Sequence, residues 1–424
     1  MHDFHYQDDQ LYCENVSLEE IAHKVGTPCY IYSHKTLVRH FRAFDQAFDA
    51  IPHTIAYAMK ANSNIAILRL MAQEGSGADI VSGGELFRAL KAGVPSQKIV
   101  FAGVGKSGDE IEQALKSDIL MFNVESAGEL QLIHEVAGKM GVRARVALRI
   151  NPDIDPKTHP YISTGLKKSK FGIGAERALE EFKTATTLAH IDVVGVHCHI
   201  GSQLTELTPF TDALKKILAL IETLKVQGIN IRYINIGGGL GITYSDEIPP
   251  HPKELAAAIS PLLHDLKCQL IMEPGRSIVG NAGVMMTRVL YNKDTEAKKF
   301  VVVDAAMNDL LRPSLYDAYH EIQHVRKPFR NQVKTVDIVG PICESGDFLA
   351  KDREIPETAS GDLLAVMSAG AYGFTMASNY NSRPRVPEVL IKDHDIHVIR
   401  ARESYDDLIR GETIPSFLKD GEIS

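Results

Sequence analysis

Short apolar runs alternate with amphipathic stretches between residues 55 and 273 of the chain. Eight of the apolar runs predict β-strands, over residues 55–60, 78–82, 99–103, 119–124, 146–151, 193–200, 233–237 and 270–273. Stretches with helical spacing and helix-forming composition follow the first seven, and they predict helices over residues 65–73, 85–91, 109–115, 127–139, 178–188, 210–226 and 255–266.

Strands that alternate with helices pair in parallel through right-handed crossovers. Eight such units close into an α/β fold, the (β/α)8 TIM barrel, whose active site lies at the C-terminal ends of the strands. The alternative is a doubly wound open sheet, which would place a G-x-G-x-x-G motif after an early strand. The eight regular units favour the barrel.

The pattern changes after about residue 280. Strand-like runs continue with only short helical pieces between them, at residues 284–290, 300–304, 335–339, 363–368 and 389–400, and residues 29–32 also resemble a strand. We therefore predict a barrel domain over residues 31–280. The second domain, mainly β and resembling a sandwich or barrel, combines residues 1–30 with 281–424.

Composition narrows the class of protein. The 424 residues are 44% hydrophobic and 24% charged, as expected of a soluble globular chain. The net charge of −8 and the lack of a basic tract argue against nucleic-acid binding, and no apolar run is long enough to span a membrane. The polar N-terminus and five scattered cysteines lead us to expect a cytoplasmic protein without a secretory leader.

Lys60 ends the first predicted barrel strand, Thr54-Ile55-Ala56-Tyr57-Ala58-Met59-Lys60. Burial disfavours an ammonium, so the pKa of such a lysine tends to fall and a nucleophilic amine becomes available. That is the setting in which a lysine forms a Schiff base with a carbonyl. The simpler interpretation is a lysine whose head group reaches solvent.

Other predicted strands also end in polar or glycine residues. Asp79 and Ser82 end the second strand, Gly237-Gly238-Gly239 the seventh, and Glu273-Pro274-Gly275-Arg276 the eighth. Glycines let backbone N–H groups converge on an anion, and the last two βα loops of a barrel commonly bind phosphate. Arg276 and Ser202 would add donors, although a glycine cluster is also compatible with a plain turn.

His197 and His199 lie two apart on the sixth predicted strand, so we expect them to face the same side. The pair resembles a metal-ligand pattern, but barrel metallohydrolases place it on the first strand and use an aspartate after the last. We therefore predict no metal, and His197 is more readily a core histidine. A lysine, a phosphate site, a strand-end carboxylate and a flat histidine ring together indicate a pyridoxal phosphate site.

The motifs that carry a family resemblance run from about residue 28 to 405. They are Tyr57-Ala58-Met59-Lys60-Ala61-Asn62, Ser82-Gly83-Gly84-Glu85-Leu86, His199-Ile200-Gly201-Ser202, Gly237-Gly238-Gly239, Glu273-Pro274-Gly275-Arg276, Cys343-Glu344-Ser345-Gly346-Asp347 and Gly370-Ala371-Tyr372. They resemble those of the alanine racemase-like, fold type III decarboxylases and, within that group, of the diaminopimelate decarboxylases. The most specific stretch is residues 151–165, continued by residues 170–173.

The resemblance implies a role for each matching residue. Lys60 would hold pyridoxal 5′-phosphate, His199 would stack on its ring, and Glu273 would meet its pyridine nitrogen. The phosphate would lie among Ser202, Gly237, Gly238, Gly239, Arg276 and Tyr372, and Gly275 would also belong to the cofactor site. The resemblance also implies a homodimer with shared active sites, in which the partner subunit supplies Cys343 as proton donor. Arg276, Arg312, Tyr316, Glu344 and Tyr372 would bind the substrate, meso-diaminopimelate.

Local chemistry supports parts of this assignment and leaves alternatives. Arg312 near Tyr316 suits a remote carboxylate but is also compatible with a solvated loop arginine, and a lone cysteine such as Cys343 is commonly a small buried hydrophobe. Ornithine and arginine decarboxylases bind a cationic tail and would not need Arg312. Alanine racemases favour an arginine where Glu273 stands. A non-catalytic homologue would lose Cys343 or Arg312, and a metallohydrolase is the most distant alternative.

Overall fold

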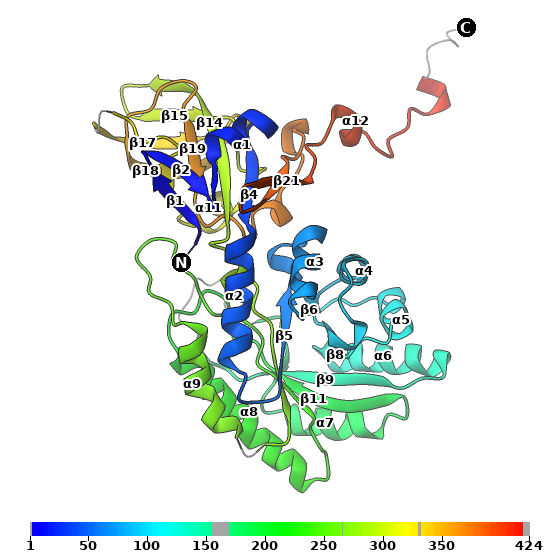
Figure 1. The fold of residues 1–424 in the computed structure, drawn as a ribbon. Coiled ribbons are helices and arrows are strands. Elements are labelled where there is room, and N and C mark those ends of the chain that lie inside the picture. Colours follow the sequence, from blue (N-terminus) through cyan, green and yellow to red (C-terminus); the bar gives the residue numbers. More distant parts are fainter. Residues whose placement is uncertain (1, 155–168, 265, 330–331, 419–424) are drawn as a thin grey trace.

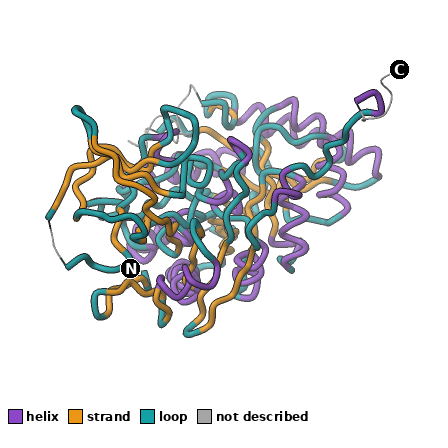
Figure 2. Tube along the Cα trace, turned by 90° about the horizontal axis from the view of Figure 1, so that it is seen from above, coloured by secondary structure: helices purple, strands orange, loops and turns teal. Residues whose placement is uncertain are grey.

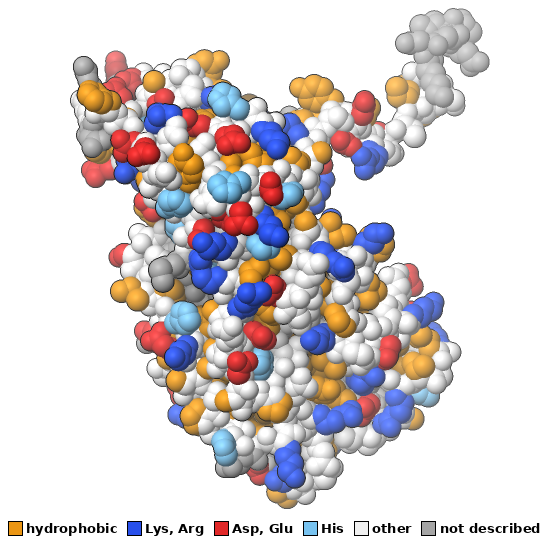
Figure 3. Space-filling model, in the orientation of Figure 1, with side chains coloured by type: hydrophobic (Ala, Val, Ile, Leu, Met, Phe, Trp, Pro, Cys, Tyr) orange, Lys and Arg blue, Asp and Glu red, His pale blue; other side chains and the backbone are white. Residues whose placement is uncertain are grey.

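The computed structural model describes residues 2–154, 169–264, 266–329 and 332–418, and it has two parts (Figure 1). The lower part in that view is built from helices and parallel strands, and the upper part mainly from antiparallel strands. In Figure 2, which is seen from above, strands lie mainly on the left and helices mainly on the right. Acidic and basic side chains are interspersed over the face shown in Figure 3. Among the described residues, no helix combines the length and apolar character needed to cross a membrane.

Eight parallel strands form a closed barrel. They are β5 (His53–Ala58), β6 (Gly77–Ile80), β7 (Ile99–Phe101), β8 (Met121–Val124), β9 (Ala144–Asn151), β11 (Ile191–His197), β12 (Tyr233–Asn235) and β13 (Gln269–Met272). Each pairs in parallel with its neighbours, and β13 pairs with β5 to close the circle. A two-residue strand, β10 (Ile173–Gly174), adds to β9. The predicted (β/α)8 fold is confirmed.

The seven predicted barrel helices are all present. They are α3 (Ile65–Gln73), α4 (Gly83–Ala92), α5 (Gly108–Lys116), α6 (Ala127–Met140), α7 (Ala178–Thr187), α8 (Thr208–Val226) and α9 (Pro252–Leu263). Serine side chains accept hydrogen bonds from the first turns of three of them, and Ser82 therefore has a capping role at the start of α4.

The eighth barrel helix was not predicted. Helix α2 (His34–Ala47) precedes the first barrel strand. It packs against both α3 and α9, the first and last of the seven predicted barrel helices. Its residues Leu37, Phe41 and Phe44 are buried in the barrel core. Helices were predicted only after strands. Because the barrel is closed, a helix that precedes β5 can take the eighth position in the ring of helices.

Residues 103–108, which follow β7, have the G-x-G-x-x-G spacing that an open sheet would place after an early strand, and this spacing was not recognised in the sequence. In the structure this loop makes contacts that stabilise the barrel. The buried Lys106 Nζ donates to the carbonyls of Gly103 and Asn123 and pairs with Glu129 at 2.7 Å, while Ser107 forms a capping box with Glu110 at the start of α5. The motif therefore lies at the start of a barrel helix and not at the first turn of a doubly wound sheet.

The second part contains a large, mostly antiparallel sheet. Its strands are β4 (Cys29–Ser33), β14 (Gly283–Asp294), β15 (Lys299–Val303), β16 (Ile322–His324), β17 (Val333–Val339), β18 (Phe348–Pro356), β19 (Leu363–Val366), β20 (Glu388–Lys392) and β21 (Asp395–Arg400). The N-terminal strands β1 (Phe4–Gln7), β2 (Gln10–Cys13) and β3 (Val16–Ser17) form a separate small sheet, followed by α1 (Leu18–Val25). Strand β4 pairs with β14 and β20, so the start of the chain completes this sheet.

Two predictions for this part were wrong. Residues 389–400 form a hairpin, β20 and β21, because the chain turns at Asp393, which has a φ of +54°. Strand β18 was missed because its middle, Lys351-Asp352-Arg353-Glu354, is charged. It lies at the edge of the sheet, paired only with β17 within the described residues, where charged side chains protect an open edge.

Candidate active site

A cavity of about 350 Å³ lies where the barrel strands end and the second part begins. It is lined by seven of the predicted site residues: Lys60, His199, Ser202, Arg276, Arg312, Tyr316 and Tyr372. Phe171, Gln203, Tyr244 and Tyr319 also line it and were not predicted. Strand-end residues far apart in the sequence thus meet at one site, as the barrel requires.

Lys60 was predicted to end the first barrel strand, but β5 ends at Ala58 and Lys60 lies in the 3-10 helix Met59–Ala61 that follows it. The second part of the fold fixes this turn, because the Tyr372 backbone N–H donates to Ala61 O at 2.8 Å and Asn62 Nδ2 donates to Gly370 O. The Lys60 side chain is 37% exposed, whereas Asp79 beside it is fully buried. The lysine is therefore held at the cavity wall with its amine accessible.

The pKa of Lys60 departs from the expected direction. Burial alone would lower it, but the buried carboxylate of Asp79 accepts a hydrogen bond from Lys60 Nζ at 2.8 Å and raises the pKa above its ordinary value. Burial and the nearby charge of Glu273 in turn raise the pKa of Asp79 to about 7. The expectation of a lowered lysine pKa was wrong because it ignored the counter-charge at the end of the next strand.

Glu273 follows β13 directly and is buried beside the cavity. Its Oε1 accepts hydrogen bonds from Asn235 Nδ2 at 2.6 Å and Asn123 Nδ2 at 3.1 Å, and its Oε2 lies 3.6 Å from His197 Nε2. Burial would raise the pKa of Glu273, but His197, Lys60 and the hydrogen bond from Asn235 together hold it below the ordinary value. The site therefore keeps a fixed negative charge at this position.

The two asparagines were missed by sequence analysis. Asn123 lies within β8 and Asn235 at the end of β12, and both are buried. The signal for them was an amide inside an otherwise apolar barrel strand, because a buried amide requires a polar partner. Here that partner is Glu273.

His197 and His199 do not share a strand, which corrects the expected geometry. Strand β11 ends at His197, which is buried and faces Glu273, whereas His199 lies in the following loop and lines the cavity. His199 Nδ1 accepts from the Gly238 N–H at 3.2 Å, and burial, with the charges of Arg149 and Lys60, holds its pKa well below the ordinary value. His199 thus presents a neutral ring.

Among the residues that the structure describes, neither histidine belongs to a cluster with metal-binding geometry. Among the described residues, the group of His, Asp and Glu close enough to bind a cation is Asp45, Asp49 and His53. That group lies near the start of β5, at the end of the strand opposite Lys60.

The glycine loop after β12 has no space for side chains. A Cβ on Gly238 would lie 2.2 Å from Glu273 O, and one on Gly239, whose φ is +118°, would lie 2.6 Å from Gly201 O. Next to this loop, Arg276 Nη2 donates to Ser202 Oγ at 3.0 Å and Arg276 Nη1 donates to Tyr244 Oη at 2.6 Å. The backbone of a glycine loop, a hydroxyl group and a guanidinium group together can bind an anion.

Two buried arginines give the cavity an excess of positive charge. Arg276 begins the short helix α10 (Arg276–Val279), and Arg312 begins α11 (Arg312–Tyr316). Their guanidinium carbons lie 4.9 Å from the Tyr372 ring and 4.6 Å from the Tyr244 ring, respectively. Neither arginine forms a salt bridge with a carboxylate of the described residues. Buried unpaired cations are costly, so the site is suited to negatively charged ligands.

Cys343 and Glu344 are not brought to this cavity by the single chain. Both are exposed, in the turn before β18. The Cys343 N–H donates to Asn381 Oδ1 at 2.7 Å, which fixes the backbone of the turn. Of the predicted stretch 151–165, residues 155–165 lie outside the described residues.

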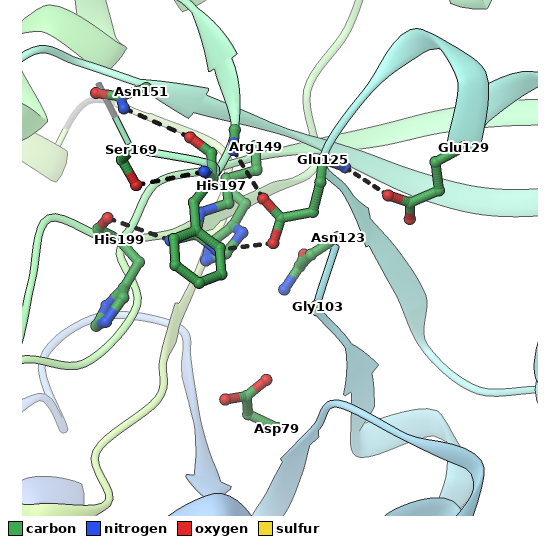
Figure 4. A network of polar contacts seen from close by, with 12 residues as sticks. Asp79, Gly103, Asn123, Glu125, Glu129, Arg149, Asn151, Ser169, His197 and His199 are labelled. Carbon is green, nitrogen blue, oxygen red and sulfur yellow. Dashed lines mark hydrogen bonds and ion pairs between the residues drawn. The ribbon is translucent and has the colours of Figure 1, made fainter. Parts of the chain in front are cut away.

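A buried ionic network supports one wall of the cavity (Figure 4). Glu125 Oε1 pairs with Arg149 Nη1 at 2.7 Å, and Glu125 Oε2 accepts from the Gly172 N–H at 2.8 Å. The Arg149 guanidinium lies 4.8 Å from the ring centre of Phe171, which lines the cavity. Sequence periodicity could not reveal this network, because Glu125 follows β8, Arg149 lies in β9, and Phe171 and Gly172 precede β10.

Comparison with known proteins agrees with this geometry. Residues 34–280 match the pyridoxal binding domain of the pyridoxal-dependent decarboxylases. The chain therefore belongs to the pyridoxal-dependent decarboxylase family, a class in which the barrel carries the cofactor site.

Individual relatives narrow the assignment to the diaminopimelate decarboxylase branch of that family. The chain is 52% identical to the diaminopimelate decarboxylase of Aquifex aeolicus over 406 residues, which cover 95% of this chain and 96% of that protein. The crystal structure of the Helicobacter pylori enzyme complexed with L-lysine has a TM-score of 0.90 and 48% identity, covering 93% of this chain and 98% of that one. The M. jannaschii enzyme, in co-complex with L-lysine, has a TM-score of 0.93 and 43% identity, covering 99% and 100%.

Proposed function

We propose that this chain is a pyridoxal phosphate-dependent carboxy-lyase that converts meso-2,6-diaminopimelate to L-lysine and carbon dioxide, the last step of lysine biosynthesis. The family membership supports the reaction class, and the near-full-length relatives support the substrate. The observation that carries the proposal is the pair of buried arginines, Arg276 and Arg312, which line one cavity with Lys60. They suit a phosphate and a second carboxylate respectively.

The residues present fit the cofactor. The glycine loop, Ser202 and Arg276 offer converging donors to a phosphate, and Gly275 brings the α10 backbone against Ala58 and Ala61 beneath Lys60. Lys60 would hold the aldehyde carbon, His199 would pack its neutral ring on the pyridine, and Glu273 would meet the pyridine nitrogen. Tyr372 would close the phosphate side.

Pyridoxal phosphate, when bound, supplies a sink for the electron pair that the departing carbon dioxide leaves behind. Glu273 remains negative at neutral pH, so it favours a proton on the ring nitrogen and strengthens that sink. Asp79 accepts a hydrogen bond from Lys60 Nζ and would take up or return a proton at that atom. Because the pKa of Asp79 is raised to about 7, it lies closer to that of an amine than the pKa of an ordinary carboxyl group does, which lowers the cost of this proton exchange.

Arg312 and Tyr316 would bind the carboxylate at the end of the substrate that is retained. Cys343 and Glu344 would enter the same cavity from a partner subunit, the cysteine to protonate the carbanion and the glutamate to bind the distal ammonium. We therefore also propose a homodimer with shared sites, which is consistent with the exposure of both residues in the single chain. The five cysteines are free thiols, which fits a cytoplasmic location.

The test is incubation of the purified protein with pyridoxal phosphate and meso-diaminopimelate, followed by assay of carbon dioxide and lysine. Borohydride reduction of the cofactor-loaded protein should place the label on Lys60, and Lys60→Ala provides the inactive control. Release of carbon dioxide from ornithine or arginine in preference to meso-diaminopimelate would contradict the substrate assignment. Labelling of a different lysine would contradict the site.

A further inference from the structure

His320 is a buried histidine behind the cavity, in the segment between α11 and β16. Its Nδ1 lies 2.8 Å from Met367 O, and its Nε2 lies 2.8 Å from Arg312 Nη1. A carbonyl oxygen can only accept, so Nδ1 carries the hydrogen. Nε2 then has a free lone pair and accepts from the guanidinium. The two contacts therefore fix both the orientation and the tautomer of the ring.

The surroundings of His320 keep the ring neutral. Burial and the adjacent charge of Arg312 lower the pKa of His320 to about 3. The backbone is fixed as well, because Arg353 Nη1 donates to His320 O at 2.7 Å. A ring held in this way is a permanent acceptor at physiological pH.

Arg312 depends on this acceptor for its orientation. Within the described chain, its hydrogen-bond partner is His320 Nε2, and its guanidinium packs 4.6 Å from the ring centre of Tyr244. Tyr244 also contacts the His320 ring, at 5.3 Å between centroids. Because Nη1 of Arg312 donates to His320, the other N–H groups of the guanidinium remain available on the side of the cavity.

We propose that His320 is the positioning residue that sets specificity for a substrate with a second carboxylate. By accepting from Arg312 Nη1, it aims the remaining N–H groups of the guanidinium at the carboxylate that the reaction retains. The inference rests on the proposed function, since it requires a ligand with an amino group at one end and a carboxylate at the other. It predicts that loss of the acceptor weakens recognition of that carboxylate and leaves cofactor binding intact.

The experiment compares two ligands of the cofactor-loaded enzyme, L-lysine and pentane-1,5-diamine. They share a five-carbon diamine chain, and only lysine has the carboxylate. Inhibition constants and shifts of the visible cofactor absorption would be measured for wild type, His320→Leu and His320→Gln. His324→Leu is the matched control, because His324 is also buried and bonded to a backbone carbonyl, Pro356 O at 3.1 Å.

We expect His320→Leu to weaken lysine binding roughly tenfold or more, as for loss of a hydrogen bond to a charged group, with diamine binding unchanged. KM for meso-diaminopimelate should rise more than kcat falls. His320→Gln keeps an acceptor and should recover part of the lysine affinity, and His324→Leu should leave the lysine-to-diamine ratio at the wild-type value. If the leucine variant does not fold, His320→Asn applies the same test with an amide too short to reach both partners.

Equal weakening of both ligands, or unchanged lysine affinity, would overturn the role of His320 while leaving the proposed function in place. A wild-type enzyme that binds the diamine as tightly as lysine would instead overturn the assignment of Arg312 to a carboxylate. The two failures are therefore distinguishable.

Discussion

Lys60 Nζ and Asp79 Oδ2 lie 2.8 Å apart, at the ends of two neighbouring barrel strands. A neutral amine is the form that attacks a carbonyl, yet this contact favours the ammonium. Before the cofactor binds, Lys60 is therefore protonated and oriented by Asp79. Uptake of an aldehyde cofactor must displace that proton, and Asp79 controls the cost.

Replacing Asp79 should therefore shift the pH dependence of cofactor uptake. Because Asp79 raises the pKa of Lys60, uptake by the wild type should accelerate as pH rises. Asp79→Asn lowers that pKa, so its profile should move to lower pH, by roughly one unit or more. Stopped-flow absorbance after mixing with pyridoxal phosphate measures the rate of uptake. Asp79→Glu keeps a carboxylate, so its pH profile should stay near that of the wild type. Superimposable profiles for wild type and Asp79→Asn would contradict this account.

Glu273→Gln should bind cofactor but lose turnover. The amide keeps the size of the side chain and removes the negative charge that Asn123 and Asn235 stabilise. We expect kcat to fall at least about 100-fold, as when a preorganised electrostatic partner is deleted. Since the pKa of Glu273 is held low, the wild-type kcat profile should show no inflection from it between about pH 5 and 9. Near-normal turnover of the variant would show that another group tunes the ring.

Gly238→Ala should disable the phosphate loop. Its Cβ would lie 2.2 Å from the backbone oxygen of Glu273, which cannot move without displacing the carboxylate. We expect a loss of stability of about 1–3 kcal/mol and much weaker cofactor binding, measured by denaturant unfolding and absorbance titration. Gly128→Ala is the control: it lies exposed in α6 with nothing within 4 Å, and it should be neutral or stabilising by about 0.5–1 kcal/mol. Equal behaviour of the two variants would refute the steric argument.

Asp309 should make the protein less stable as pH rises. Burial raises its pKa to about 7 in the folded state, so between about pH 4 and 7 the folded chain keeps a proton that the unfolded chain has lost. The free energy of unfolding should fall across that window, by roughly 1–4 kcal/mol from this group. Asp309→Asn removes the titration and can still accept from the Ala306 N–H. Urea unfolding at pH 5 and pH 8 should then show a smaller pH difference for Asp309→Asn than for wild type, and parallel losses would exclude Asp309 as the cause.

Local patterns were sufficient to predict the barrel. Helix α3 was predicted with the bounds that the structure has, because its apolar spacing is encoded in adjacent positions. Glycine, lysine and arginine at strand ends were predicted to meet, because the barrel alone determines where strand ends lie. The division of the chain at residues 30 and 280 and the roles of the site residues stay predictions.

Properties that depend on neighbours in space could not be predicted. The pKa of Lys60 depends on Asp79 in the adjacent strand, and the charge of Glu273 depends on amides from two other strands. Helix α2 completes the barrel only because β13 meets β5. His320 gave no signal in the sequence, since its partners Arg312 and Met367 belong to distant segments.

The position of Cys343 and Glu344 leads to a prediction about assembly. Both are exposed and outside the cavity of their own chain, so they can complete a site only if a second subunit presents them. A symmetric dimer would then carry two equivalent sites, each with Lys60 from one chain and Cys343 from the other. Two variants that are inactive alone, Lys60→Ala and Cys343→Ala, should therefore complement each other when mixed.

In a mixed dimer, one site receives both lesions, while the other has an intact Lys60 and an intact Cys343. Random exchange places about half of the dimers in this hybrid form with one working site of two, so activity should approach about a quarter of wild type. Mixing Lys60→Ala with Glu273→Gln is the matched control, because both residues lie in the barrel of one chain, and every site of that hybrid would carry one lesion. Recovery with the first pair and none with the second would establish the shared site. Absence of recovery with the first pair, when mass spectrometry shows that the subunits exchange, would place Lys60 and Cys343 in the same chain and refute it.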